Sequence, residues 1–175
     1  HKWKFVFAKG SSYYSVHIYR DGAHLETKTI ALNNLVNGDR DVNYILDGLD
    51  GNAYSYKMYL SSGSYVFGYD FTEGQGLNLT DTTGNGRTGV LNSKAEWLTE
   101  KGLAFNGKNG YVSLPRLDDV MFSNGFIIEF EAKLNTINQT SKFFDFAMSY
   151  DSGDTSAGKS SINAGTSANT NKLDF

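Results

Sequence analysis

The chain has 175 residues, of which 39% are hydrophobic and 14% aromatic, which is enough apolar material for one domain with a substantial core. Its net charge of −3 provides no basic surface for nucleic acid. The sequence contains no run of about 18 apolar residues, so no membrane-spanning helix is predicted. The absence of cysteine excludes disulfides and thiolate metal sites. The 19 glycines and single proline favour strands joined by tight turns.

Residues 1–60 predict a series of β-strands. Polar and apolar side chains alternate over 1–8 and place Trp3 on the apolar face, which is the period of a half-buried strand. A hairpin turn is predicted at 20–22, and the segment 32–50 is rich in Asn-Gly and Asp-Gly turns. The other predicted strands of this half cover 13–19, 24–32, 42–46 and 53–60.

The segment 65–115 combines an alternating aromatic strand with a compact two-strand pattern. Within LAFNG-KNG-YVSLP (103–115), Phe105 and either Tyr111 or Val112 are predicted to point into the core. The turns at 106–107 and 109–110 each hold an Asn-Gly pair, which is expected to supply the positive φ angles that tight turns require.

Two further strands are predicted at 125–134 and 142–148. In the second, strict alternation places Phe144 and Phe146 on one face and Phe143 with Asp145 on the other. The segment 149–170 is mostly small and polar, which predicts a loop around a short strand near Ile162, with a ligand-facing loop as the alternative.

The motifs of residues 71–112 resemble the laminin-G-like, concanavalin A-like lectin/glucanase family. They are Phe71-Thr72-Glu73-Gly74, the loop Asp81 to Gly86, Val90-Leu91, and the run from Leu103 to Val112. The resemblance implies an all-β, two-sheet antiparallel sandwich with a concanavalin A-like jelly-roll topology.

The order of the two halves differs from the order in that family. Residues 1–64 resemble the closing half of a laminin-G-like jelly roll and residues 65–175 its opening half, and Ser61–Ser64 at the join have the composition of a flexible linker. A circularly permuted single domain, a window from a tandem array and halves exchanged between identical chains all fit this order. The self-complementing domain is favoured because a half-sandwich would expose its apolar face and strand edges.

The resemblance also implies a structural calcium ion in the loop 81–86. Asp81 and Asn85 offer the hard oxygen ligands that Ca²⁺ requires, completed from the closing segment by Asp47, Asp50 or Asn52. The alternative is an Asx-capped turn without metal.

Catalysis is not expected from this sequence. Glu129 and Glu131 occupy the strand that carries the carboxylates in the related glucanases, but the central Asp of that pattern is replaced and its third carboxylate is missing, which disfavours a glycoside hydrolase. No pair among His1, His17 and His24 has metal-ligand spacing.

Carbohydrate binding is the remaining specific expectation. Aromatic rings pack against sugar faces, and candidate rings are Trp3, Trp97 and the tyrosines at 13, 14, 54, 56, 65 and 69, although Trp3 and Phe105 are expected in the core. We therefore expect a non-catalytic carbohydrate-binding or adhesive module of a larger extracellular or surface-exposed protein, with a glycan or surface protein as partner. The alternative is an assembly module that self-associates through exchanged halves.

Overall fold

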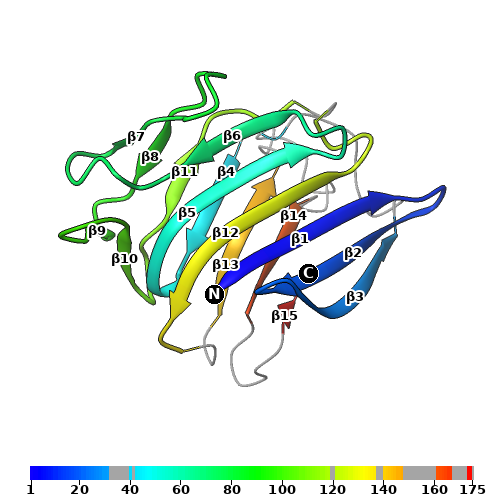
Figure 1. Cartoon of the computed structure of the whole chain (residues 1–175), viewed down its shortest axis with the longest axis horizontal. Coiled ribbons are helices and arrows are strands. Elements are labelled where there is room, and N and C mark those ends of the chain that lie inside the picture. The colour runs from blue at the N-terminus through cyan, green and yellow to red at the C-terminus, as the bar shows by residue number, and fades with distance from the viewer. Residues whose placement is uncertain are drawn as a thin grey trace, which may run out of the picture.

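A computed structural model describes residues 1–31, 40, 42–118, 121–136, 140–147, 161–166 and 173–174. These residues form two antiparallel β-sheets that face each other (Figure 1). The predicted all-β, two-sheet antiparallel sandwich is thereby confirmed, and the arrangement is compatible with a jelly roll. None of the described residues belongs to a helix that could span a membrane.

The first sheet has eight strands. They are β1 (Lys2–Lys9), β2 (Tyr13–Arg20), β3 (Ala23–Ala31), β5 (Asp50–Leu60), β6 (Tyr65–Tyr69), β9 (Glu96–Trp97), β10 (Leu103–Asn106) and β12 (Phe126–Leu134). Their order is β3-β2-β1-β12-β5-β10-β9, and β6 also pairs with β5.

The second sheet has seven strands. They are β4 (Val42–Asp47), β7 (Asn78–Leu79), β8 (Gly89–Leu91), β11 (Val112–Leu114), β13 (Ser141–Ala147), β14 (Ser161–Thr166) and β15 (Leu173–Asp174). Their order is β15-β14-β13-β4-β11-β8-β7. β14 confirms the strand predicted near Ile162, whereas the turn-rich residues 32–39 and most of the loop 149–170 lie outside the described residues.

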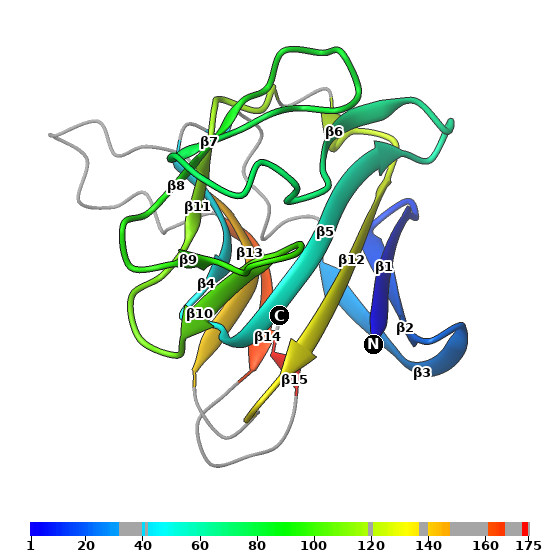
Figure 2. The same cartoon turned by 60° about the vertical axis from the view of Figure 1, so that its left-hand side comes forward.

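Strands from both halves of the chain pair with one another in both sheets (Figure 2). In the first sheet β12 lies between β1 and β5, and in the second β4 lies between β11 and β13. The join at residues 61–64 is the tight turn of the β5–β6 hairpin, because the Leu60 N–H donates to the Ser64 carbonyl at 2.8 Å and Gly63 has a φ of 95°. The expectation of a flexible linker at 61–64 was therefore wrong.

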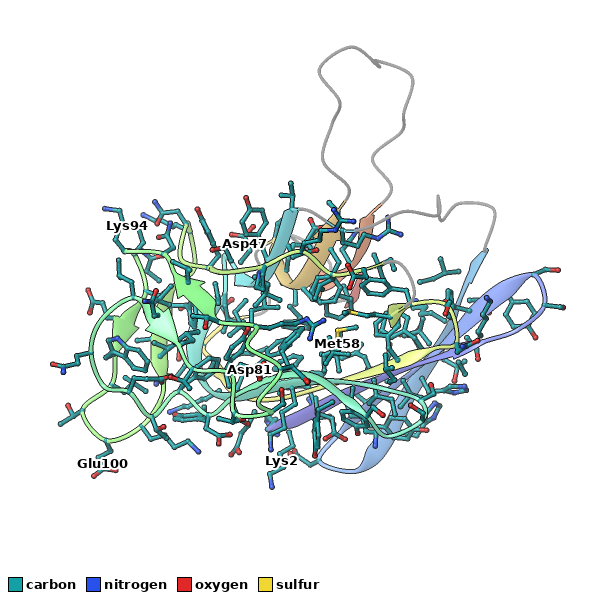
Figure 3. All side chains as sticks on the ribbon, turned by 90° about the horizontal axis from the view of Figure 1, so that it is seen from above. Lys2, Asp47, Met58, Asp81, Lys94 and Glu100 are labelled. Atoms are coloured by element: carbon teal, nitrogen blue, oxygen red, sulfur yellow. The ribbon has the colours of Figure 1, made fainter. Side chains whose placement is uncertain are left out.

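The core between the sheets is strongly aromatic. Phe7 of β1 stacks on Phe126 of β12 with their ring centroids 4.2 Å apart. Figure 3 shows Met58 of β5 between the two sheets, where it is fully buried. Trp3 and Phe105 are 7% and 5% exposed, which confirms both as core residues.

Phe143 is also a core residue, and this corrects its prediction. The pairing register of β13 with β14 shifts between Lys142 and Phe144, and Leu46 in the neighbouring β4 has a positive φ of 58°. A bulge of this kind breaks the two-residue alternation of a strand. The Phe143 side chain therefore points inward with that of Phe144, and its ring centroid lies 5.1 Å from that of Phe130.

The two Asn-Gly turns of 103–115 differ from each other. Gly107 has the predicted positive φ of 75°, but Gly110 is not among the glycines with positive φ, so that expectation was wrong. A Cβ atom on Gly110 would lie 3.1 Å from the Phe105 ring, so the absence of a side chain at Gly110 makes room for that ring. The sequence left open whether Tyr111 or Val112 points into the core. Val112 is fully buried and Tyr111 is half-buried, so Val112 occupies the core position.

Candidate functional site

The carboxylate of Asp81 accepts four hydrogen bonds from its own protein. Oδ1 accepts from the backbone N–H groups of Gly68 and Thr83, both at 3.0 Å, and from the Thr83 hydroxyl at 2.7 Å. Oδ2 accepts from the Arg87 N–H at 3.0 Å. Three of the four donors therefore converge on Oδ1 and one on Oδ2.

These hydrogen bonds determine the charge state of Asp81. Burial alone raises the pKa of this carboxyl, but the hydrogen bonds from Thr83, Arg87 and Gly68 outweigh burial and hold the pKa below its ordinary value of 3.8. Asp81 is therefore an ionised cap that ties the loop 81–87 to β6.

Asn85 also serves to hold the loop. Its side-chain amide donates to the carbonyl oxygens of Tyr65 at 2.8 Å and Val66 at 3.2 Å. The Tyr69 hydroxyl donates to the Arg87 carbonyl from the same strand. These hydrogen bonds fasten the loop to β6.

The other proposed calcium ligands do not join this loop. Gly68, which Asp81 contacts, pairs with Lys57 of β5. Asp50 lies seven positions before Lys57 on β5 and pairs with Asn106 of β10. At about 3.3 Å per residue this separates them by roughly 23 Å. Asp47 and Asn52 lie near Asp50, and no described group of three His, Asp or Glu side chains could hold a metal. The residues present do not fit a calcium ion in this loop, and the capped turn fits them.

A groove of about 910 Å³ lies on the outer face of the first sheet. Figure 3 shows Lys2, which lines it, on the outer side of this sheet and Asp47 on the opposite side of the sandwich. Its polar lining comprises Lys2, Lys4, Tyr19, Ser55, Lys57, Asp70, Lys101, Glu129 and Glu131.

Strand alternation builds the floor of this groove. The register aligns Tyr19 of β2, Lys4 of β1, Glu129 of β12 and Lys57 of β5 in one row across the sheet. Glu131 lies in the adjacent row, two residues further along β12 on the same face. The opposite faces of these strands supply the aromatic core, so the outer residues alternate with buried ones.

Glu129 is engaged with two neighbours inside the groove. It lies 3.0 Å from the Lys4 ammonium group and accepts a hydrogen bond from the Tyr59 hydroxyl at 2.8 Å. The hydrogen bond to Glu129 raises the pKa of Lys4, while burial, followed by that same carboxylate, raises the pKa of Tyr59. Lys57, Lys101 and Glu131 also line the groove, and among the described residues none of the three is in an ion pair.

The structure sorts the predicted sugar-stacking rings. Trp3, Tyr14, Tyr56 and Tyr69 are buried and cannot stack on a ligand. Tyr13 and Tyr65 are exposed, whereas Tyr54 and Trp97 are half-buried.

Sequence reasoning missed Tyr19, which lines the groove. The available signal was its place on the face of β2 opposite Val16 and Ile18, both of which are fully buried.

The three histidines also separate into two places. His1 contacts the Asp21 carboxylate, whereas the rings of His17 and His24 lie 6.1 Å apart on the β2–β3 hairpin. The expectation that no histidine pair has ligand spacing was made along the sequence, and the hairpin brings these two rings near each other.

No protein-family model matches the chain, and no curated protein matches it. Fold and surface therefore define the class: an antiparallel two-sheet β-sandwich with a charged groove on the outer face of its eight-stranded sheet.

Proposed function

We propose that this chain is a non-catalytic carbohydrate-binding module of a larger extracellular or surface protein. We further propose that it is a laminin-G-like, concanavalin A-like jelly roll with its halves in permuted order, and that the outer face of the eight-stranded sheet holds the glycan. Adhesion to a glycosylated surface is the activity that such a module would supply.

The observation that carries this proposal is the groove over Lys4, Glu129 and Lys57, which is lined by charged side chains. Its volume suits a short oligosaccharide, and its charged side chains can hydrogen-bond sugar hydroxyls. Tyr19 supplies a half-buried ring at one end of the central row. The rigid strands position these groups before any ligand arrives.

The same groove supports binding over hydrolysis. A retaining glycosidase needs one carboxylate as a free nucleophile and the other as a proton donor, about 5 Å apart. Glu129 is instead held by Lys4 at 3.0 Å and by the Tyr59 hydroxyl at 2.8 Å, which suits a role in ordering the groove.

A glycan array probed with the labelled chain tests the proposal. For each glycan bound, affinity is then measured for a Lys57→Ala/Lys101→Ala variant and for a matched Lys94→Ala/Lys108→Ala control. The control removes the same charge from exposed lysines outside the groove lining.

We expect the groove variant to lose about tenfold or more in affinity, because each lysine donates charge-assisted hydrogen bonds. The control should bind within about twofold of the native chain, because its two lysines lie outside the groove lining. An array without hits, or equal losses in both variants, would overturn the proposal.

Assembly through exchanged halves is the second candidate. The observation that favours it is that strands on either side of the 61–64 turn share both sheets, so opening this turn would allow the same pairings between two chains. Light scattering at increasing protein concentration tests it: growing dimers alongside a silent array support assembly, and a constant monomer contradicts it.

A further inference from the structure

His17 of β2 and His24 of β3 converge on one hydroxyl group at the outer surface of the hairpin. His17 Nδ1 and His24 Nε2 each lie 3.0 Å from Thr27 Oγ1. Six residues separate the two histidines in the sequence, and the register of the hairpin brings them together: His17 pairs with Thr27, and His24 pairs with Tyr19 after a register shift.

The shared hydroxyl shows that the two ring nitrogens aim at a common point. A hydroxyl has one proton and two acceptor lone pairs, so Thr27 can donate to one ring and accept from the other. In that arrangement the ring nitrogen that accepts the Thr27 proton presents a lone pair toward this point. A neutral imidazole with its lone pair aimed outward is the form that binds transition metals.

We propose that His17 and His24 bind one divalent transition-metal ion, of the class of Cu²⁺, Ni²⁺ or Zn²⁺. Metal–imidazole bonds to zinc are about 2.0–2.1 Å long, so an ion at the place of the Thr27 hydroxyl needs each ring nitrogen to approach by about 0.9 Å. Rotation of the exposed His24 and Thr27 side chains can supply this movement. Water would complete the coordination shell of a two-histidine site.

The surroundings of the pair suit a bound cation. The Ser15 hydroxyl lies 3.3 Å from His17 Nε2 and orients that ring, in the manner of an outer-shell partner of a metal ligand. The Tyr19 ring meets the His24 ring edge-on, with 5.2 Å between their centroids. The nearby cations Lys4 and Lys28 are each neutralised, by Glu129 at 3.0 Å and Glu26 at 2.8 Å.

The site is separate from the proposed glycan groove, whose lining does not include His17, His24 or Thr27. It also differs from a calcium site in its chemistry, since imidazole nitrogen suits transition metals and Ca²⁺ prefers oxygen. Failure of glycan binding would therefore leave this proposal intact, and failure of metal binding would leave the glycan proposal intact.

Isothermal titration calorimetry of the tag-free, metal-stripped chain with CuCl₂, ZnCl₂ and CaCl₂ tests the site. We expect one Cu²⁺ or Zn²⁺ per chain, tighter binding of Cu²⁺ than of Zn²⁺, and no heat from Ca²⁺. His17→Ala and His24→Ala should each weaken binding by about tenfold or more, because loss of a ligand costs at least as much as loss of an outer-shell partner.

His1→Ala is the matched control, since His1 contacts Asp21 and not the pair. It should bind Zn²⁺ within about twofold of the native chain, which is well under the roughly tenfold loss of affinity that removal of an outer-shell partner causes. Native-like binding in either pair variant, or no binding by the native chain, would overturn the proposal.

A spectroscopic readout on the native chain avoids any dependence on the folding of variants. The chain has only 3 histidines, so their ring protons are resolved in a simple proton NMR spectrum. Zn²⁺ should shift the ring signals of two histidines and leave the third in place. Shifts confined to His1, or no shifts, would contradict the site.

Discussion

Replacement of Asp81 by asparagine tests how strongly the hydrogen bonds to its carboxylate hold the loop 81–87. Asparagine keeps one oxygen for the donors at Oδ1 but turns an NH₂ group toward the Arg87 N–H, which then faces a donor in place of Oδ2. The remaining bonds from Gly68 and Thr83 also lose their charge assistance. Since a hydrogen bond to a charged group contributes about 1.5–3 kcal/mol, we expect Asp81→Asn to lower the free energy of unfolding by about 2–3 kcal/mol.

Urea unfolding followed by tryptophan fluorescence measures this loss. Asp118→Asn is the matched control, because Asp118 is exposed and lies 3.7 Å from Arg116 in a surface ion pair. The control should change stability by less than about 1 kcal/mol. An Asp81→Asn variant that is as stable as this control would refute the capped-turn interpretation.

The pH dependence of the same variant gives a second check. Because the pKa of Asp81 is lowered in the folded state, its contribution is fully present above the ordinary value of 3.8 and is lost as the pH falls through the folded value. The stability gap between native chain and Asp81→Asn should therefore stay constant from about pH 7 to 5 and shrink below about pH 4. A gap that widened in acid would contradict the assigned charge state.

Four further substitutions have outcomes set by packing and hydrogen bonds. Phe143→Ala should lower the free energy of unfolding in urea by about 3–5 kcal/mol, because its ring is fully buried against Phe130; a loss under 1 kcal/mol would place the ring outside the core. Gly51→Ala should give insoluble or unfolded protein, since its Cβ would lie 2.1 Å from the Lys133 carbonyl oxygen. The control Gly84→Ala has open space around its Cβ, and it should still melt cooperatively after losing about 1 kcal/mol of unfolding free energy. Tyr59→Phe removes the hydrogen bond to Glu129 and should cost about 1–2 kcal/mol in thermal unfolding, and an unchanged melting temperature would count against that bond.

The strands were predictable because alternation and turn residues are local signals. β1, β2 and β12 bury every second residue, so their pattern reports the strand directly. Phe143 could not be assigned in this way, since a bulge against β14 reverses its side chain and no residue of β13 announces it. Gly110 misled for a related reason: its small size serves the contact with Phe105 and not a turn.

The candidate sites depended on long-range register, which a single sequence does not contain. The groove needs β1 and β5 to lie on either side of β12, although these strands are far apart in the chain. The His17 and His24 rings meet only because the hairpin register shifts between Ile18 and Tyr19. The hydrogen-bonded carboxylate of Asp81 likewise depends on β6, which supplies the Gly68 donor from 13 residues earlier.

The central claim is that the two halves of the chain complete one sandwich, and an engineered disulfide between β1 and β12 tests it most directly. Val6 and Ile127 are cross-strand partners, and such pairs have Cα separations of about 4.5–5.5 Å, within the range of a disulfide. The native chain has no cysteine, so a Val6→Cys/Ile127→Cys variant carries only the designed pair.

Under mild oxidation this variant should form a disulfide within a monomer of about 19.3 kDa on a non-reducing gel. A Val6→Cys/Val90→Cys control, which places the second cysteine on β8 of the other sheet, should stay reduced. Covalent dimers, or no disulfide at all, would contradict the claim that β1 and β12 pair within one chain.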